Sequence, residues 1–180
     1  MTAPELLTPR LVLRAHRVDD FADCAAMWAD PAVTRFIGGA PSTASESWAR
    51  LLRYAGHWAL LGYGSWAVIE HASGRFVGDV GLADYQRELD PPRDLAPELG
   101  WALAPWAHGR GLGTESVSAA LAWADAHLAA PRTACLIDPG NAASLGLARK
   151  VGFVERARTL YKGQPAIVLE RARQSAAITW

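Results

Sequence analysis

The order of apolar and polar side chains predicts a strand and two helices in the first third of the chain. Residues 10–14 have an apolar centre between polar ends, which is typical of a short strand. Apolar side chains then recur at helical spacing over residues 18–29, and an Asp-Pro pair ends this predicted helix. A capping-box pattern over residues 43–46 predicts a second helix that continues to Gly62.

Strand and helix patterns alternate along the rest of the chain. Two β-rich segments joined at a Ser-Gly pair predict a hairpin, and a long acidic connection leads from it to another strand. After Pro105 a glycine-rich turn opens a helix that reaches Leu128, and a strand, a helix and a last hairpin follow. The predicted strands cover residues 65–70, 76–83, 98–103, 133–137, 153–161 and 166–171, and the last helix covers residues 141–150. The order β, α, α, three β, α, β, α, two β indicates a mixed α/β sheet.

Composition and charge exclude several classes of protein. The chain has 180 residues, of which 51% are apolar, and its 18 basic and 18 acidic side chains give a formal net charge of zero. A chain of this length buries about 70% of its unfolded surface, and no linker or repeat divides it, so residues 1–180 are expected to form a single domain. The lack of a basic excess argues against nucleic acid as a partner, and the lack of a long apolar run argues against a membrane. We expect a cytoplasmic protein.

The positions of cysteine and histidine argue against disulfide and metal chemistry. Cys24 and Cys135 lie far apart in the sequence, so neither a CxxC motif nor a disulfide framework can form. The five histidines contain no HxxH or HxxxH pair, and we therefore expect no metal site. No Gly-x-Ser-x-Gly elbow surrounds a serine, which removes the common hydrolase signature.

A glycine-rich turn over residues 108–115 carries the strongest chemical signal. Gly109, Gly111 and Gly113 permit positive φ and close approach of a ligand, and the free amides at the start of the next helix favour an anion such as a pyrophosphate. The alternative is a loop that needs its glycines only to turn. The residues after the last glycine are not Lys-Ser/Thr, and the glycine spacing differs from the dinucleotide fingerprint, so ATP and NAD are not expected.

At this point three segments resemble a known family. Residues 101–115 resemble the acetyl-CoA signature Gln/Arg-x-x-Gly-x-Gly/Ala of the Gcn5-related N-acetyltransferase (GNAT) superfamily, with His108 in the Gln/Arg position. Residues 141–153 resemble the later N-x-x-S…K-x-G-F segment of the same superfamily. Residues 8–14 resemble the opening of the branch that modifies the N-termini of ribosomal proteins. The resemblance spans about residues 8–172.

The resemblance implies a fold and a co-substrate. It implies an α/β fold in which a twisted, mostly antiparallel sheet is flanked by helices and its two central strands, residues 98–103 and 133–138, splay apart. Acetyl-CoA is the implied co-substrate, with pantetheine in that gap and pyrophosphate at the glycine-rich turn. Arg110 either adds a charged contact or is solvated, and Asn141 either binds pantetheine or caps its helix. The implied cofactor-binding residues are Trp101, Ala102, Leu103, His108, Gly109, Arg110, Gly111, Leu112, Gly113, Thr114 and Asn141.

Acetyl transfer to an amine needs a base and a proton donor for the departing thiolate. The resemblance makes Glu98 the candidate base, directly or through water, and an exposed strand-end glutamate without a role is the alternative. Ser144 is the candidate general acid or thiolate-orienting hydroxyl, or it only satisfies the helix backbone. Many relatives have a tyrosine four positions later, where this chain has Ala148. Neither cysteine is placed for an acetyl-enzyme, so direct transfer in a ternary complex is expected.

The acceptor stays open from the sequence. A protein N-terminus and a small molecule both offer a primary amine. The alternative function is a non-catalytic module for CoA binding, sensing or interaction with a partner. The acidic connection over residues 84–94 is either a solvated loop or a gate that attracts a cationic amine. The acids of this gate are Asp84, Glu88, Asp90, Asp94 and Glu98. Residues 176–180 either dock on a second subunit or fray, so a monomer and a homodimer are both open.

Overall fold

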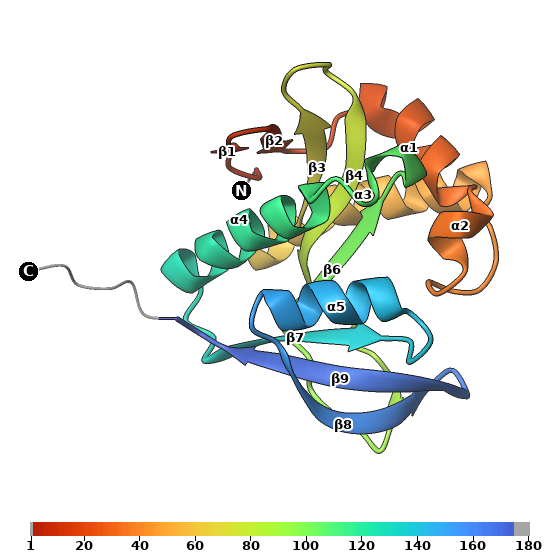
Figure 1. Cartoon of the computed structure of the whole chain (residues 1–180), viewed down its shortest axis with the longest axis vertical. Coiled ribbons are helices and arrows are strands. Elements are labelled where there is room, and N and C mark those ends of the chain that lie inside the picture. The colour runs from red at the N-terminus through yellow and green to blue at the C-terminus, as the bar shows by residue number, and fades with distance from the viewer. Residues whose placement is uncertain (1, 175–180) are drawn as a thin grey trace, which may run out of the picture.

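The computed structural model describes residues 2–174 (Figure 1), so residues 176–180 lie outside the described part. The helices are η1 (Val18–Asp20), α1 (Phe21–Trp28), α2 (Pro31–Thr34), α3 (Ala44–Leu61), η2 (Pro105–Ala107), α4 (Leu112–His127) and α5 (Ala142–Lys150). The strands are β1 (Leu6–Leu7), β2 (Leu11–Arg14), β3 (Ser65–Glu70), β4 (Phe76–Ala83), β5 (Leu89–Asp90), β6 (Glu98–Leu103), β7 (Arg132–Ile137), β8 (Val154–Tyr161) and β9 (Gln164–Ala172).

The strands of the described residues form one sheet in the order β1-β2-β3-β4-β6-β7-β9-β8-β5. Neighbouring strands are antiparallel except β6 and β7, which run parallel. Helices flank the sheet (Figure 1). The predicted mixed α/β fold with a mostly antiparallel sheet is therefore confirmed.

β6 and β7 separate after a single paired position. Glu98 pairs with Ala134, whereas β6 follows β4 for six positions and β7 follows β9 for six. Each of the two strands is held by its outer antiparallel partner, and the sheet consequently opens between them (Figure 1). The predicted splay of the two central strands is confirmed.

The long helix α3 begins where the sequence predicts and brings a tryptophan into the core. The Thr43 side chain accepts a hydrogen bond from the Glu46 amide, and the Glu46 carboxylate accepts one from the Thr43 amide at 2.7 Å. Near its other end the helix buries Trp58, whose ring meets Trp66 of β3 and Trp123 of α4 edge-on at centroid distances of 4.8 and 5.2 Å. These aromatic contacts join helices on two different chain segments to the sheet.

The sequence pattern does not predict the short elements α2, β1 and β5. In α2 the Asp30 carboxylate accepts a hydrogen bond from the Ala32 amide at 2.8 Å, and Pro31 occupies the first turn, where a helix needs no N–H donor. The Asp-Pro pair therefore starts a new helix as well as following the end of α1. β5 pairs Leu89 with Tyr161 of β8, a contact between distant segments that local patterning does not show.

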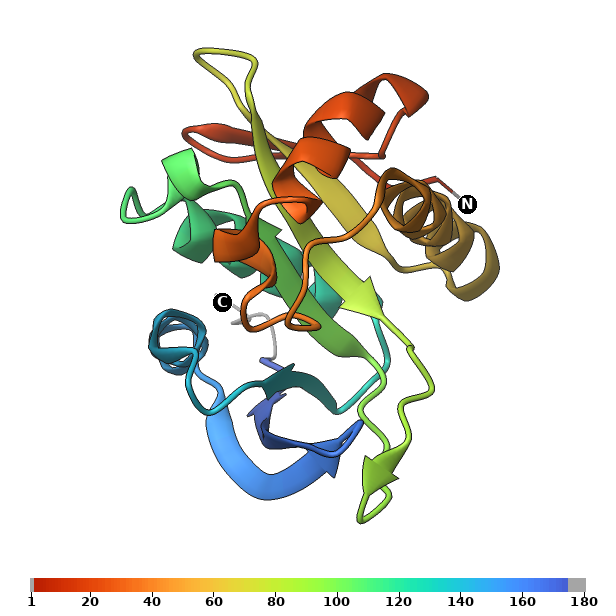
Figure 2. The same cartoon turned by 90° about the vertical axis from the view of Figure 1, so that its right-hand side faces the viewer.

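The loop between α2 and α3 reaches across the opening in the sheet. Figure 2 shows this loop passing in front of β6 toward β7. A Cβ atom at Gly140, in the turn after β7, would lie 3.2 Å from the ring of Phe36 in this loop. The opening therefore has a wall on the side of α1 to α3. Over residues 2–174, no helix is long and apolar enough to cross a membrane.

Candidate active site

A cavity of about 860 Å³ lies where β6 and β7 separate. Its wall is formed by the α2–α3 loop, α3, β6, β7, the start of α5 and the β8–β9 turn. Five of the residues expected from the sequence line it: Glu98, Trp101, Ala102, Asn141 and Ser144. The other expected residues do not line the cavity: Leu103 is the last residue of β6, and the turn over residues 108–114 lies beyond the carboxyl end of this strand.

The edge of β6 that faces the gap presents unpaired backbone groups. The Ala104 amide donates to the Val77 carbonyl of β4 at 2.8 Å, so alternate positions along β6 direct their backbone toward β4. By this alternation the backbone amide and carbonyl of Ala102 point toward β4, whereas those of Trp101 and Leu103 point toward the gap. Because β7 pairs with β6 only at Glu98, the backbone amide and carbonyl of Trp101 have no strand partner in the described part of the chain.

His108 and the glycines shape the start of α4. The His108 Nε2 atom lies 2.9 Å from the Leu103 carbonyl oxygen, so this carbonyl, which faces the gap, already has a hydrogen-bond partner. Gly109 and Gly111 have φ of 71° and 77°, which the turn requires. A Cβ atom at Gly113 would lie 2.8 Å from Leu103 Cδ1, so this glycine is needed for packing rather than for its backbone conformation.

The first turn of α4 has free amides. The Glu115 amide is the first that reaches a helical carbonyl, that of Gly111, at 3.1 Å. Gly111 is the N-cap and has no side chain that could satisfy the preceding amides. The amides of residues 112–114, together with the helix dipole, therefore form a site for an anion. The Arg110 side chain is neither free nor only solvated, because its guanidinium forms an ion pair with Glu70 at 2.7 Å.

The opening segment of the chain holds the start of α4, a link that the sequence analysis missed. The Glu115 carboxylate accepts hydrogen bonds from Thr8 Oγ1 at 2.6 Å and from the Arg10 amide and Nε at 2.9 and 2.6 Å. Arg10 also donates to the Arg110 carbonyl at 2.8 Å. Burial of Glu115 opposes its charge, but these hydrogen bonds outweigh it and lower the pKa of this carboxyl. The only sequence signal was the Thr-Pro-Arg motif itself.

Asn141 and Ser144 sit at the start of α5. The Asn141 side chain accepts a hydrogen bond from the Ser144 amide at 3.0 Å, which confirms that it caps the helix. The Ser144 hydroxyl accepts a hydrogen bond from Trp101 Nε1 at 3.3 Å, so this pair bridges β6 and α5 at the gap. Ala148, in the position where many relatives have tyrosine, is fully buried and offers no proton donor.

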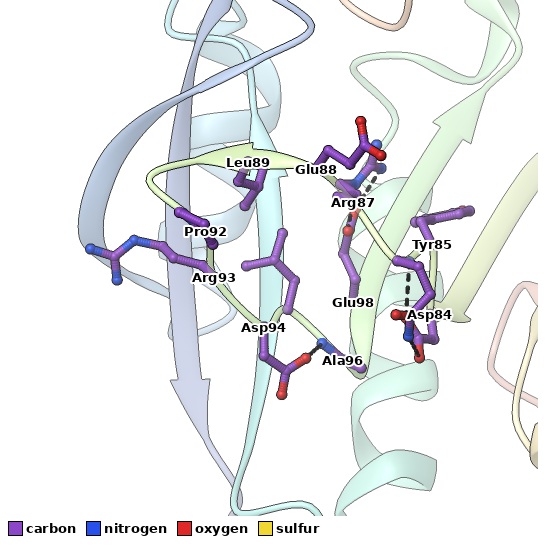
Figure 3. A pocket seen from close by; sticks show the side chains of 12 residues that line it. Asp84, Tyr85, Arg87, Glu88, Leu89, Pro92, Arg93, Asp94, Ala96 and Glu98 are labelled. Carbon is purple, nitrogen blue, oxygen red and sulfur yellow. Dashed lines mark hydrogen bonds and ion pairs between the residues drawn. The ribbon is translucent and has the colours of Figure 1, made fainter.

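Glu98 is buried and paired, and it is not the exposed strand-end residue considered as the alternative. Its side chain is 5% exposed, and its two carboxylate oxygens accept hydrogen bonds from Arg87 Nε and Nη2 at 2.6 and 2.7 Å (Figure 3). Burial of Arg87 opposes its charge, but the hydrogen bonds and charge of Glu98 prevail and raise the pKa of the guanidinium. Each oxygen of Glu98 keeps a further lone pair for a water or an amine.

The acidic connection faces a neighbouring depression of about 720 Å³ rather than the cavity. Among the five acids of the predicted gate, only Glu98 lines the cavity, and it shares this position with Tyr85 and Arg87 on the wall between the two hollows. Asp84 accepts hydrogen bonds from the backbone and side chain of Gln86, which fold it into its own loop (Figure 3). The lining of the cavity therefore does not support a gate for cationic amines.

A second carboxylate, Asp79 of β4, lies on the cavity wall and was also missed. It is 3% exposed and accepts hydrogen bonds from Trp28 Nε1 at 2.8 Å and from the Tyr54 hydroxyl at 3.3 Å, and it lies 2.7 Å from His16 Nε2. Burial raises the pKa of Tyr54, which keeps its hydroxyl a donor. A lone aspartate within the apolar strand over residues 76–83 was the sequence signal, because a buried carboxylate requires partners.

Comparison with known proteins agrees with this geometry. Residues 10–154 match the family model of the acetyltransferase (GNAT) domain. A candidate GnaT-family acetyltransferase of Bordetella pertussis is similar in structure, with a TM-score of 0.82 and 31% identity over 94% of this chain and 100% of that chain. The ribosomal L7/L12 α-N-protein acetyltransferase RimL, solved in complex with coenzyme A, shares the fold, with a TM-score of 0.75 and 13% identity over 95% and 98% of the two chains.

A curated relative adds a further sequence match. The uncharacterized protein YkkB of Bacillus subtilis strain 168 is 32% identical over 113 residues, which are 61% of this chain and 63% of that protein. The match thus spans less than two thirds of YkkB. Because the family model covers most of the chain, the protein belongs to the GNAT family. The resemblance of its sequence to this family of acetyltransferases is confirmed.

Proposed function

We propose that the protein moves the acetyl group of acetyl-CoA directly to a primary amine within a ternary complex. The observation that carries the proposal is the open edge of β6 beside the free amides of α4. An extended pantetheine chain has amides that fit a strand edge, and a pyrophosphate fits a helix start. In this arrangement Trp101 offers its backbone amide and carbonyl, and residues 112–114 offer their amides.

We propose that residues at both ends of the gap between β6 and β7 hold the co-substrate. The turn over residues 109–114 would hold the pyrophosphate, and His108 would keep the Leu103 carbonyl occupied so that the turn stays in place. Asn141 is engaged in capping α5, so its contact with pantetheine is secondary to that role. When bound, acetyl-CoA supplies an activated acyl group as a thioester.

The amine must lose one proton and the thiolate must gain one. Balanced over the reaction, the amine nitrogen forms a bond to the acetyl carbon, the C–S bond breaks, and the products are an N-acetylated amine and the CoA thiol. Glu98 is proposed to accept the proton of the amine, directly or through water, with Arg87 fixing its orientation. Ser144 is proposed to orient the thiolate through its hydroxyl.

Direct transfer is favoured by the state of the cysteines. Cys135 lines the cavity but is 1% exposed, and Cys24 is fully buried. Burial raises the pKa of both thiols, so neither is a thiolate at neutral pH. A Cys135→Ala variant is therefore expected to retain acetyl transfer. If the reaction used an acetyl-cysteine intermediate, this variant would lose acetyl transfer.

The decisive experiment measures thiol release from acetyl-CoA with a panel of amines. Glu98→Gln is expected to lower kcat by about a hundredfold, as is usual on loss of a general base, with CoA affinity nearly unchanged. Glu88→Gln is the matched control, because this exposed acid lies in the acidic connection that precedes β6 and does not line the cavity. A protein that binds CoA yet releases no thiol with any amine would instead be a CoA-binding or sensing module.

A further inference from the structure

Two arginines of α3 reach the cavity from the side opposite α5. Arg50 and Arg53 lie nearly one helical turn apart, and both line the cavity. Within residues 2–174, neither has a carboxylate within 4.0 Å, whereas Arg87 on the same wall is paired with Glu98. Arg35 and Lys162 add further positive charge to the lining.

The carboxylates that line the same cavity are already engaged. Asp79 has hydrogen bonds with Trp28 and Tyr54 and a close contact with His16, as described above. Asp138 accepts a hydrogen bond from the Gly140 amide at 2.7 Å. Glu98 is held by Arg87. Glu98 and Arg87 cancel in charge, and the remaining cations of the lining, Arg35, Arg50, Arg53 and Lys162, outnumber Asp79 and Asp138. The net charge of the cavity lining is therefore positive, although the chain as a whole is neutral.

Aromatic rings hold these two arginines in place. The Arg50 guanidinium lies 3.6 Å from the ring centroid of Trp28, and the Arg53 guanidinium lies 5.4 Å from that of Tyr85. The Nε atom of Arg50 is buried and has no hydrogen-bond partner. A buried donor without an acceptor is unfavourable, and a ligand oxygen would remove this deficit. Stacked guanidinium groups also form a rigid fork that suits a carboxylate.

Tyr85 lies near Arg53 and Arg87, whose guanidinium groups are 5.4 and 4.5 Å from the centroid of its ring. Burial raises the pKa of Tyr85, the charge of Glu98 adds to this effect, and the charges of Arg53, Arg87 and Arg50 oppose it. The Tyr85 side chain is therefore close to all four charges. Arg50, Arg53 and Glu98 line the same cavity, so a small acceptor bound there can approach both the arginines and the candidate base.

Resting on the proposed function, we infer that the acceptor is a primary amine that also carries a carboxylate, bound by Arg50 and Arg53 while its amino group faces Glu98. A free amino acid has this chemistry, and so does a peptide N-terminus with an acidic side chain nearby. A polyamine does not, because its positive charges would face those of the arginines.

The test compares matched acceptors at saturating acetyl-CoA by the rate of thiol release. The panel contains free amino acids, the corresponding amino acid carboxamides, spermidine, and a pair of peptide amides that differ only in Glu or Gln at the second residue. The carboxylate member of each pair is expected to have a kcat/KM at least about tenfold higher, because a site built for a hydrogen-bonded group rejects the analogue that lacks it. The free-acid and peptide pairs identify which source of carboxylate is used.

Arginine variants connect that preference to the cavity. Arg50→Met and Arg53→Met are expected to raise KM for the carboxylate acceptors about tenfold or more and to reduce their advantage over the carboxamides. Arg149→Met, an exposed arginine of α5 outside the cavity, is the matched control. Arg53 is exposed, so its variant keeps the test valid if loss of the Arg50–Trp28 contact destabilises the fold.

The outcomes separate this inference from the proposed function. Equal turnover of acids, carboxamides and spermidine overturns the carboxylate inference and leaves acetyl transfer standing. An equal loss of activity toward acids and carboxamides in both arginine variants also overturns it. Absence of thiol release with every amine, in a protein that binds CoA, overturns the proposed function and the inference together.

Discussion

Glu115 offers a direct test of how the opening segment is tied to the start of α4. In Glu115→Gln the side chain keeps its length but loses its charge and one acceptor oxygen. The remaining oxygen can still accept from Thr8 and from the Arg10 amide, which lie at 2.6 and 2.9 Å from Oε1. The new NH2 group, however, faces Arg10 Nε, so two donors oppose each other where a 2.6 Å ion pair stood.

The size of the effect follows from the exposure of the pair. A hydrogen bond to a charged group contributes about 1.5–3 kcal/mol when well buried. The Arg10 side chain is 49% exposed and that of Glu115 is 15% exposed, so solvent screening reduces this value. We expect the free energy of unfolding to fall by about 1–2 kcal/mol, which corresponds to roughly 2–8 °C in Tm for a domain of this size.

The pH dependence gives the prediction its sign. Because the folded state lowers the pKa of Glu115, its contribution to stability is fully present above the unfolded pKa, about 4.3, and is lost as pH falls through the folded pKa. The difference between wild type and Glu115→Gln should therefore be largest near pH 7 and shrink toward pH 3.

Urea unfolding of both proteins at several pH values measures this difference. Glu155→Gln is a suitable control, because Glu155 forms an exposed ion pair with Arg158 at 2.9 Å that should contribute little. A difference between wild type and Glu115→Gln that is absent at pH 7, or that grows as pH falls, would refute the reasoning. The loss of the Arg10 anchor should also weaken CoA binding, measured by calorimetry.

Three further changes test the packing around the site. Gly113→Ala places a Cβ atom 2.8 Å from Leu103 Cδ1 and is expected to cost about 1–3 kcal/mol of stability. It should also lower CoA affinity in titration calorimetry, and an unchanged affinity would contradict the placement of CoA at this turn. Trp66→Ala empties a fully buried site and should cost about 3–5 kcal/mol in urea unfolding, so a loss below 1 kcal/mol would be inconsistent with its burial. Asp125→Asn leaves Arg171, whose side chain is 7% exposed, without its charged partner and should cost about 3–5 kcal/mol of stability. An unchanged Tm in thermal melting would contradict this assignment.

The parts of the fold that were predictable have local causes. The capping box of residues 43–46 starts α3 because both hydrogen bonds lie within one turn. The glycines at 109 and 111 adopt positive φ because the turn requires it, as their spacing indicated. The short strand β5 was not predictable, since Leu89 is ordered by pairing with Tyr161, far along the chain. The same holds for the Thr8–Glu115 hydrogen bond.

The candidate site divides in the same way. Trp101, Asn141 and Ser144 were identified from motifs and do line the cavity. The burial of Glu98 and its ion pair with Arg87 could not be predicted from the sequence. Arg87 belongs to a loop whose path is set by contacts with β8 and β9. A gate for cations was one interpretation of the acidic connection, yet its residues Asp84, Glu88 and Asp94 line a separate depression.

The sequence by itself determined the family, the order of the main helices and strands, and the position of the glycine-rich turn before α4. These features depend on periodicity, caps and glycine conformations, which act over a few residues. Only the tertiary structure decided the charge of the cavity, because Arg50, Tyr85 and Glu98 lie on separate segments and meet only when α3 packs against the sheet. Net charge is a sum over the chain, whereas a ligand experiences the charges that folding brings together.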